Sequence, residues 1–194
     1  SIIVIDNILS PDECDSIKHF IDSCDNCNIV GTKKKIIGSC NWLSQLVMSR
    51  CSSFIPKSLY VENSLLDDKK LDHRDDYLYW NSPSINDCWR MIRCSPGSSL
   101  SSHFDARYVK SVDHKSIYTI MIYLSSNNDG ELLFKDKSIS VYPAVGRVVI
   151  FDQDLLHNGE HNSQSKYFIR SEIMYTRSKP LESNNDIQAM NLYS

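Results

Sequence analysis

Two histidines and one aspartate are the residues whose types and spacing suit chemistry most clearly. His103 and Asp105 are separated by one residue, and in an extended segment such side chains share a face and can bind one ion. His157 follows the apolar run 147–151, which is typical of a strand that holds a loop residue in place. Two histidines and one carboxylate cover one face of an octahedron and leave three positions open, as in non-haem Fe(II) sites, whereas structural zinc takes a closed tetrahedral set. We therefore expect these three residues to bind one Fe(II) ion.

Two basic residues follow His157 at a spacing that suits anion binding. Lys166 and Arg170 are four residues apart in a segment of strand-like composition, so both side chains face one side. A dicarboxylate bound to the metal by one end needs a cation for its distal carboxylate, either the point charge of lysine or the fork of arginine. On the residues alone, either side chain can take this role. A structural ion pair with Glu172 or Asp152 is the alternative for Arg170.

Short strands separated by turns are predicted to position these residues. Turn-forming residues occur at 95–97, 127–130 and 143–146. The β-branched and apolar runs around these turns predict strands over 2–5, 89–94, 116–124, 131–135, 138–142, 147–151 and 167–176. Many short strands at such spacing are typical of a β-sandwich or barrel, so the sequence predicts a mainly β fold.

Helices are expected in the first third of the chain. Ser10 suits an N-cap, Pro11 the first helical position and the two following acids the helix N-terminus, so a helix is predicted from Pro11 onward. The apolar spacing of residues 41–51 predicts a second helix. The three lysines at 33–35 are interpreted as a solvated turn, and the polar stretch 61–87 as a loop.

The composition is that of an ordinary globular protein. The 194 residues fit one domain, and a net charge of −3 with a pI near 6.0 argues against a nucleic-acid partner. Neither a signal peptide nor an apolar run of the roughly 20 residues that a membrane span needs is recognised. The seven scattered cysteines indicate reduced thiols, and Cys24 and Cys27 lack the second pair of a zinc knuckle. We expect a cytoplasmic protein that is a monomer or a weak homodimer.

The order of these segments resembles the prolyl-4-hydroxylase-like branch of the 2-oxoglutarate and Fe(II)-dependent dioxygenases. The matching features are the opening strand and helix, Pro96-Gly97 before the His103–Asp105 motif, the strand pair 118–124 and 129–134, and the strands 141–151 before His157. The resemblance extends from Ile2 to about Tyr175. It implies one domain over 1–194, with a double-stranded β-helix, or jelly roll, over 88–177 and N-terminal helices packed on one sheet. The other segments are a strand and helices over 1–60, a variable loop over 61–87 and a peripheral tail over 178–194.

The resemblance also implies the ligands and the cofactors. His103, Asp105 and His157 are the expected iron ligands and catalytic residues. The expected cofactors are Fe(II), 2-oxoglutarate as cosubstrate, and O2, with ascorbate as a further candidate reductant.

A second set of roles concerns the cosubstrate. The resemblance implies that Lys166 binds the distal carboxylate of 2-oxoglutarate and that Arg170 lines its pocket. Tyr123 falls where relatives place a hydroxyl near this carboxylate, and Thr119 shares its strand face; buried strand core is the alternative for both. The chain departs from the family at Cys94, where relatives frequently have a tyrosine. Prolyl specificity is therefore not carried over.

The expected activity is hydroxylation of a protein or peptide side chain, prolyl by analogy, with release of succinate and CO2. One alternative is an oxygenase or demethylase that acts on a nucleic-acid base or a small molecule. A second alternative is a non-catalytic jelly-roll binding module, against which the intact set of ligands argues.

Overall fold

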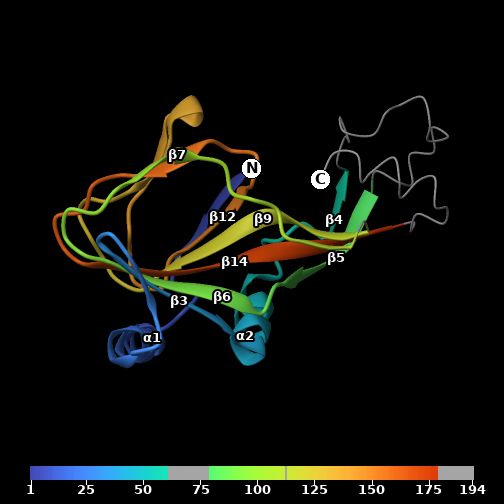
Figure 1. The fold of residues 1–194 in the computed structure, drawn as a ribbon. Coiled ribbons are helices and arrows are strands. Elements are labelled where there is room, and N and C mark those ends of the chain that lie inside the picture. Colours follow the sequence, from blue (N-terminus) through green and yellow to red (C-terminus); the bar gives the residue numbers. More distant parts are fainter. Residues whose placement is uncertain (61–78, 112, 179–194) are drawn as a thin grey trace.

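The computed structural model describes residues 1–60, 79–111 and 113–178, which form two antiparallel β-sheets and two α-helices (Figure 1). The larger sheet has the order β1-β12-β9-β14-β6-β3-β2, with β4, β5 and β8 joined to it. Its strands are β1 (Ile2–Ile5), β2 (Asn28–Val30), β3 (Lys33–Ser39), β4 (Ser58–Tyr60), β5 (Tyr79–Ile85), β6 (Cys88–Cys94), β8 (Val109–Ser111), β9 (His114–Tyr123), β12 (Val148–Asp152) and β14 (Lys166–Arg177). The smaller sheet has the order β11-β10-β13-β7, with β7 (Leu100–His103), β10 (Leu132–Phe134), β11 (Ile139–Val141) and β13 (His157–Gly159).

Eight of these strands form a jelly roll. Along the chain, β6, β9, β12 and β14 belong to the larger sheet, while β7, β10, β11 and β13 belong to the smaller one. The chain therefore crosses repeatedly from one sheet to the other, which is the topology of a double-stranded β-helix. The predicted mainly β fold with a jelly-roll core is confirmed, and all seven predicted strands are present.

The two faces of β14 differ because successive side chains of a strand point to opposite sides. Ile169 and Ile173 are fully buried in the hydrophobic core beneath the larger sheet. Lys166 and Arg170 alternate with them and line a cavity between the two sheets. This one strand therefore contributes both to the core and to the candidate site.

The helices α1 (Pro11–Ser23) and α2 (Asn41–Cys51) lie on the same side of the larger sheet, below β3 and β6 in Figure 1. A capping box starts α1: Glu13 N donates to the Ser10 hydroxyl (3.2 Å), and Ser10 N donates to the Glu13 carboxylate (2.8 Å). The guanidinium of Arg50, in the last turn of α2, donates two hydrogen bonds to the same carboxylate. Both predicted helices are thus confirmed, and an ion pair connects them.

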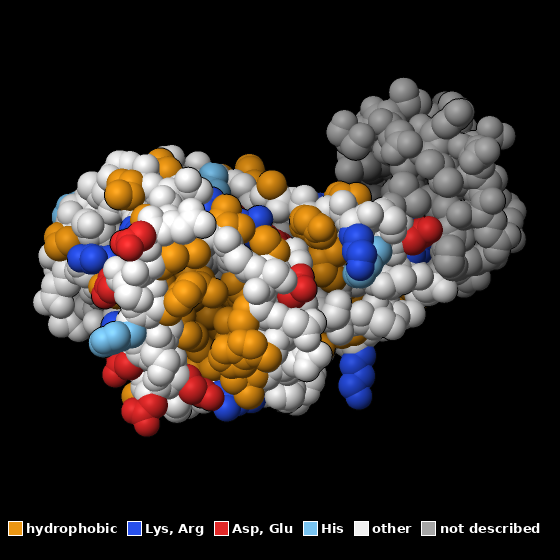
Figure 2. All heavy atoms as spheres, turned by 60° about the horizontal axis from the view of Figure 1, so that its bottom comes forward, with side chains coloured by type: hydrophobic (Ala, Val, Ile, Leu, Met, Phe, Trp, Pro, Cys, Tyr) orange, Lys and Arg blue, Asp and Glu red, His pale blue; other side chains and the backbone are white. Residues whose placement is uncertain are grey.

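The helix side of the molecule carries an apolar groove of about 480 Å³ between α1, α2 and β3. Hydrophobic side chains gather on this face in Figure 2, and Phe20 and Trp42, which line the groove, are half or more exposed. Among the described residues, no helix has the length and hydropathy needed to cross a membrane. All seven cysteines are free thiols.

The loop expected over 61–87 is wrong in its last part. Residues 61–78 lie outside the described residues, but 79–85 form β5, which pairs with β14. Trp80 and Ile85 are buried, so the strand contributes to the core. The turn-forming residues of this segment lie at an irregular point of the strand. Ser82 has φ of 53° beside Pro83, and the register of β5 with β14 shifts there. A bulge accommodates proline within the strand.

The turn expected at the three lysines is also wrong. Residues 33–35 belong to β3, whose seven residues all pair with β6. The turn lies just before them, where Gly31 has φ of 58° and joins β2 to β3. Pairing with β6 therefore outweighs the weak strand preference of lysine. Most of the tail expected over 178–194 lies outside the described residues.

Candidate metal centre and its cavity

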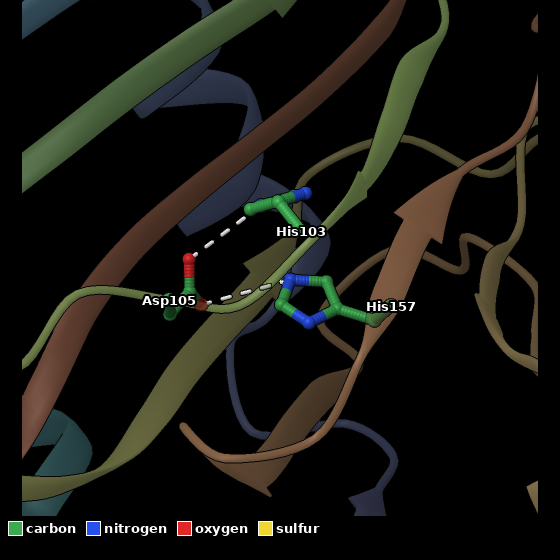
Figure 3. Close-up of side chains that lie close together, drawn as sticks. All are labelled: His103, Asp105 and His157. Atoms are coloured by element: carbon green, nitrogen blue, oxygen red, sulfur yellow. Dashed lines mark ion pairs between the residues drawn. The ribbon is translucent and has the colours of Figure 1, made fainter. Parts of the chain in front are cut away.

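Three predicted ligands converge between the two sheets (Figure 3). His103 ends β7, His157 begins β13 opposite it, and Asp105 lies in the segment after β7. One carboxylate oxygen of Asp105 is 3.7 Å from Nε2 of His103, and the other is 3.7 Å from Nε2 of His157. Candidate ligand atoms from all three lie within 4.8 Å of one another, and no other such group of three occurs in the part of the chain that the structure describes. Cys24 and Cys27 belong to no such cluster.

Backbone carbonyls orient both imidazoles. Nδ1 of His103 lies 2.9 Å from the carbonyl oxygen of Ser101, and Nδ1 of His157 lies 2.9 Å from that of Leu155. Because a carbonyl only accepts, each ring carries its proton on Nδ1 and leaves the Nε2 lone pair for an ion. Burial lowers the pKa of His157, which favours the neutral form that binds metals. This donor set therefore fits a divalent metal ion.

The carboxylate of Asp105 is buried and held from two strands. The Thr119 hydroxyl on β9 donates to Oδ2 (2.7 Å), and the Arg170 guanidinium on β14 pairs with Oδ1. Both contacts fix the orientation of the carboxylate, and the arginine balances its charge. The structure thus gives Arg170 an ion-pair partner other than the two proposed from the sequence. Thr119 contacts Asp105 and is not among the residues that line the cavity.

The three ligands face a cavity of about 440 Å³, a size suited to a small ligand. Lys166, Arg170 and Tyr123 line it together with Cys94. Tyr123 is fully buried, and this burial raises the pKa of its phenol, so the hydroxyl remains a hydrogen-bond donor. The structure therefore brings three of the four expected cosubstrate residues to one cavity.

Lys166 is buried, with 6% of its surface exposed, and burial lowers the pKa of its ammonium. Its Nζ donates to the carbonyl oxygen of Gly130 (2.6 Å). Since a lysine ammonium has three donors, two of them stay available for an anion. Gly130 has φ of 69°, and a Cβ there would lie 2.8 Å from Cβ of Asn162 and 3.2 Å from Nζ of Lys166. The Gly130 turn therefore positions Lys166, a role that the sequence analysis missed.

Three further basic residues line the cavity and were missed as site residues: Lys33, Lys35 and Arg90. Lys33 and Lys35 are two residues apart on β3, so both point to the cavity face. The spacing of Lys33 and Lys35 is visible in the sequence, but the sequence analysis did not predict the strand that directs both side chains to one face.

Comparison with known proteins supports the same interpretation. Residues 89–171 match the 2OG-Fe(II) oxygenase superfamily, whereas no curated protein matches the chain. Among solved structures, a viral collagen prolyl hydroxylase from Paramecium bursaria Chlorella virus-1, in complex with 2-oxoglutarate, is similar at 17% identity and a TM-score of 0.61, covering 89% of this chain and 94% of that chain. A Pseudomonas putida prolyl-4-hydroxylase is similar at 12% identity and a TM-score of 0.54, covering 92% and 93%.

A third similar structure is a prolyl hydroxylase from Trichoplax adhaerens in complex with a peptide fragment of hypoxia inducible factor. It is 15% identical with a TM-score of 0.55 and covers 100% of this chain and 87% of that chain. At such identities the three structures establish the fold alone, which this chain shares with these prolyl hydroxylases. The family match covers β14 through Ser171 and includes all three converging ligands. Residues 89–171, which hold all three converging ligands, therefore match the 2OG-Fe(II) oxygenase superfamily, and this match indicates Fe(II) and 2-oxoglutarate as the cofactors.

Proposed function

We propose that this protein hydroxylates a side chain of a protein or peptide, with His103, Asp105 and His157 as the ligands of Fe(II). The observation that carries the proposal is the convergence of three ligand groups whose imidazoles are both oriented by backbone carbonyls. A set of two histidines and one carboxylate leaves room on the metal for a bidentate cosubstrate and O2. Peptide substrates are proposed by analogy with the similar structures, and a prolyl residue is the first candidate.

The chain's own residues bind and orient the reactants. When bound, Fe(II) and 2-oxoglutarate supply the oxidising chemistry that inserts one oxygen atom of O2 into a C–H bond, with release of succinate and CO2. Lys166 binds the distal carboxylate of 2-oxoglutarate with its two available donors, and the Tyr123 hydroxyl lies in the same cavity as a further donor. Thr119 and Arg170 hold Asp105 in place for the metal.

Apolar side chains limit the access of water to this site. Met121, Phe151 and Phe168 line the cavity beside the ligands. The ring of His157 packs against those of Phe134 (5.8 Å between centroids) and Phe151 (4.7 Å). Exclusion of water strengthens the electrostatic interactions of the bound groups and prevents side reactions.

Anaerobic spectroscopy tests the metal centre. Addition of Fe(II) and 2-oxoglutarate to the wild-type protein is expected to give a weak visible charge-transfer band, which His103→Ala removes. His19→Ala, an exposed histidine on α1, is the matched control and keeps the band. Absence of the band in the wild type, or an unchanged band in His103→Ala, contradicts the assignment of the ligands.

Mass spectrometry tests the reaction. The loaded protein is incubated in air with peptides that contain proline, lysine or asparagine, and succinate is measured in parallel. A product heavier by one oxygen atom, formed in step with succinate, supports hydroxylation. Loss of a methyl group as formaldehyde from a methylated substrate identifies a demethylase instead.

A further inference from the structure

The cavity extends from the metal-facing strands to the β3 side of the larger sheet. One row of residues in register crosses the sheet from Lys35 on β3 through Ile92 and Phe168 to Tyr123 on β9. Lys35 on β3 is therefore two strands away from β14, which is about 10 Å at ordinary strand spacing. It nevertheless lines the same cavity as Lys166 and Arg170 of β14. Lys166 lies in the next row on this face of the sheet, in register with Cys94 and Lys33.

Lys35 carries a charge without a counter-ion. Among the described residues, its ammonium makes no hydrogen bond and no ion pair. The charges that act on it most are those of Arg90 and Arg170; together with burial, which is the larger effect, they lower its pKa. These arginines pair with Glu172 and Asp105, respectively. A half-buried cation beside two others is unfavourable until an anion joins it.

Its neighbours on the strand are different. Lys33 also lines the cavity, but its Nζ donates to the carbonyl oxygen of Ser99 (3.0 Å). Lys34 points to the opposite face, where its Nζ donates to the carbonyl oxygen of Asp22 (3.0 Å). Lys35 is thus the one lysine of this run that lacks an acceptor among the described residues.

Loading with cofactors leaves this excess of positive charge in place. The cavity is lined by five basic residues, Lys33, Lys35, Arg90, Lys166 and Arg170, and by two acidic residues, Asp105 and Glu131. Glu172, which pairs with Arg90, adds a third carboxylate, so the positive charges exceed the negative ones by two. The dication of iron and the dianion of 2-oxoglutarate cancel each other. An additional anion is therefore favoured beside Lys35 even when both are bound.

Part of the cavity lining is apolar and exposed. Val30, Leu100 and Phe104 line the cavity, yet each exposes between 44% and 65% of its surface. Exposed apolar groups and a half-buried cation in one cavity suit a ligand that combines an apolar surface with one carboxylate. An extended peptide with an acidic side chain near the reacting residue has both features.

We propose that Lys35 binds an aspartate or glutamate side chain of the peptide substrate and so makes the enzyme selective for acidic peptides. This inference rests on the proposed function and names the substrate class of the same site. Lys35 is a specificity-determining residue in this proposal because it is not one of the candidate metal ligands and would contact the substrate.

Peptide binding tests the proposal without turnover. Two pools of fluorescent peptides share a central proline, lysine or asparagine; the flanking positions are Asp or Glu in one pool and Asn or Gln in the other. Fluorescence polarisation is recorded with the protein loaded with Zn(II) and 2-oxoglutarate at low salt. The wild type is expected to bind the acidic pool about tenfold more tightly. The preference should disappear in Lys35→Met and remain in the matched control Lys34→Met.

A charge-reversed variant keeps the test decisive if Lys35→Met folds poorly. Lys35→Glu is expected to prefer a third pool with Lys or Arg at the flanking positions, and thermal melting verifies the fold of each variant. Equal or undetectable binding of the acidic and amide pools by the wild type overturns the proposal. A preference that persists in folded Lys35→Met also overturns it.

Succinate release separates this inference from the proposed function. If the iron-loaded wild type forms no succinate under any condition while the acidic preference is present, the hydroxylase proposal fails and the binding assignment stands. If Lys35→Met instead raises the KM for 2-oxoglutarate without changing peptide preference, the anion beside Lys35 is the cosubstrate, and the acidic-peptide inference is overturned.

Discussion

The two faces of the larger sheet carry opposite kinds of residue on the same strands. On β14, Ile169 and Ile173 point to the helices and are fully buried, while Lys166 and Arg170 point into the cavity. The helix face gains its stability from apolar burial. The cavity face places charged groups out of water and pairs most of them with a partner in the chain.

The difference shows how one sheet serves both stability and chemistry. Side chains on the helix face can be exchanged for others of similar volume at a modest cost in stability. Those on the cavity face depend on specific hydrogen bonds, such as the one from Thr119 to Asp105. Substitutions on the cavity face should therefore change binding, and substitutions on the helix face should change stability.

The largest effect is expected from Asp105→Asn, which keeps the shape of the side chain but removes its charge. Loss of a ligand should lower the affinity for Fe(II) by more than about 100-fold, the upper range for loss of a residue that only supports a ligand. Asp154→Asn, which alters an exposed aspartate, is the control. Titration with Fe(II) measures the affinity of both variants. An affinity in Asp105→Asn equal to that of the wild type would show that Asp105 is not a metal ligand.

The next largest effect is expected from Lys166→Met. The variant keeps the length of the side chain but removes the charge, so the KM for 2-oxoglutarate should rise about thirtyfold, or roughly 2 kcal/mol, with little change in kcat. Initial rates of succinate formation give both constants. The control is Lys137→Met, at an exposed lysine outside the cavity lining. An unchanged KM for 2-oxoglutarate would indicate that Arg170, and not Lys166, binds the distal carboxylate.

Thr119→Val tests a positioning residue. It removes the hydrogen bond to Asp105 at nearly constant volume, and the affinity for Fe(II) should fall about tenfold, at the lower end for such supporting contacts. The KM for 2-oxoglutarate should stay the same because Thr119 does not line the cavity. Thr176→Val on β14 changes an exposed threonine as a control. If the KM rises instead, Thr119 contacts the cosubstrate, as the sequence had suggested.

The sequence predicted most elements because their patterns are local. The run 41–51 has the apolar spacing of a helix and forms α2 over the same residues. Failures occurred where pairing partners far along the chain decide the structure: β3 is a strand because β6 lies beside it, and β5 because β14 does. Local propensity is a weak guide in such cases.

The candidate site, like the secondary structure, was predictable only in part. The three ligands have distinctive types and spacing, and the structure brings them together. The partners of Asp105 were not predictable, because Thr119 and Arg170 reach it through the register of β9 and β14. Residue types reveal candidate ligands, while the contacts that orient them follow from strand pairing.

On the helix face, Ile169→Val should cost about 1 kcal/mol of the free energy of unfolding, because it removes one buried methylene. Urea denaturation measures the loss, and the KM for 2-oxoglutarate should be unchanged. Phe168→Leu, at the neighbouring position that faces the cavity, is the contrasting variant and should change binding. A changed KM in Ile169→Val would show that the two faces are coupled.

The smallest effect is expected where α1 and α2 meet. The hydrogen bonds of Arg50 lower the pKa of Glu13 from 4.5 to about 2. A lowered pKa in the folded state adds stability above the unfolded value, and this stability is lost as the pH falls from 4.5 toward 2. Glu13→Gln can keep the capping box but removes the charge, so it should cost less than about 1 kcal/mol at pH 7. Its stability should then change less than that of the wild type between pH 5 and pH 2 in urea denaturation, and an identical pH dependence in both proteins would exclude a role for the pair.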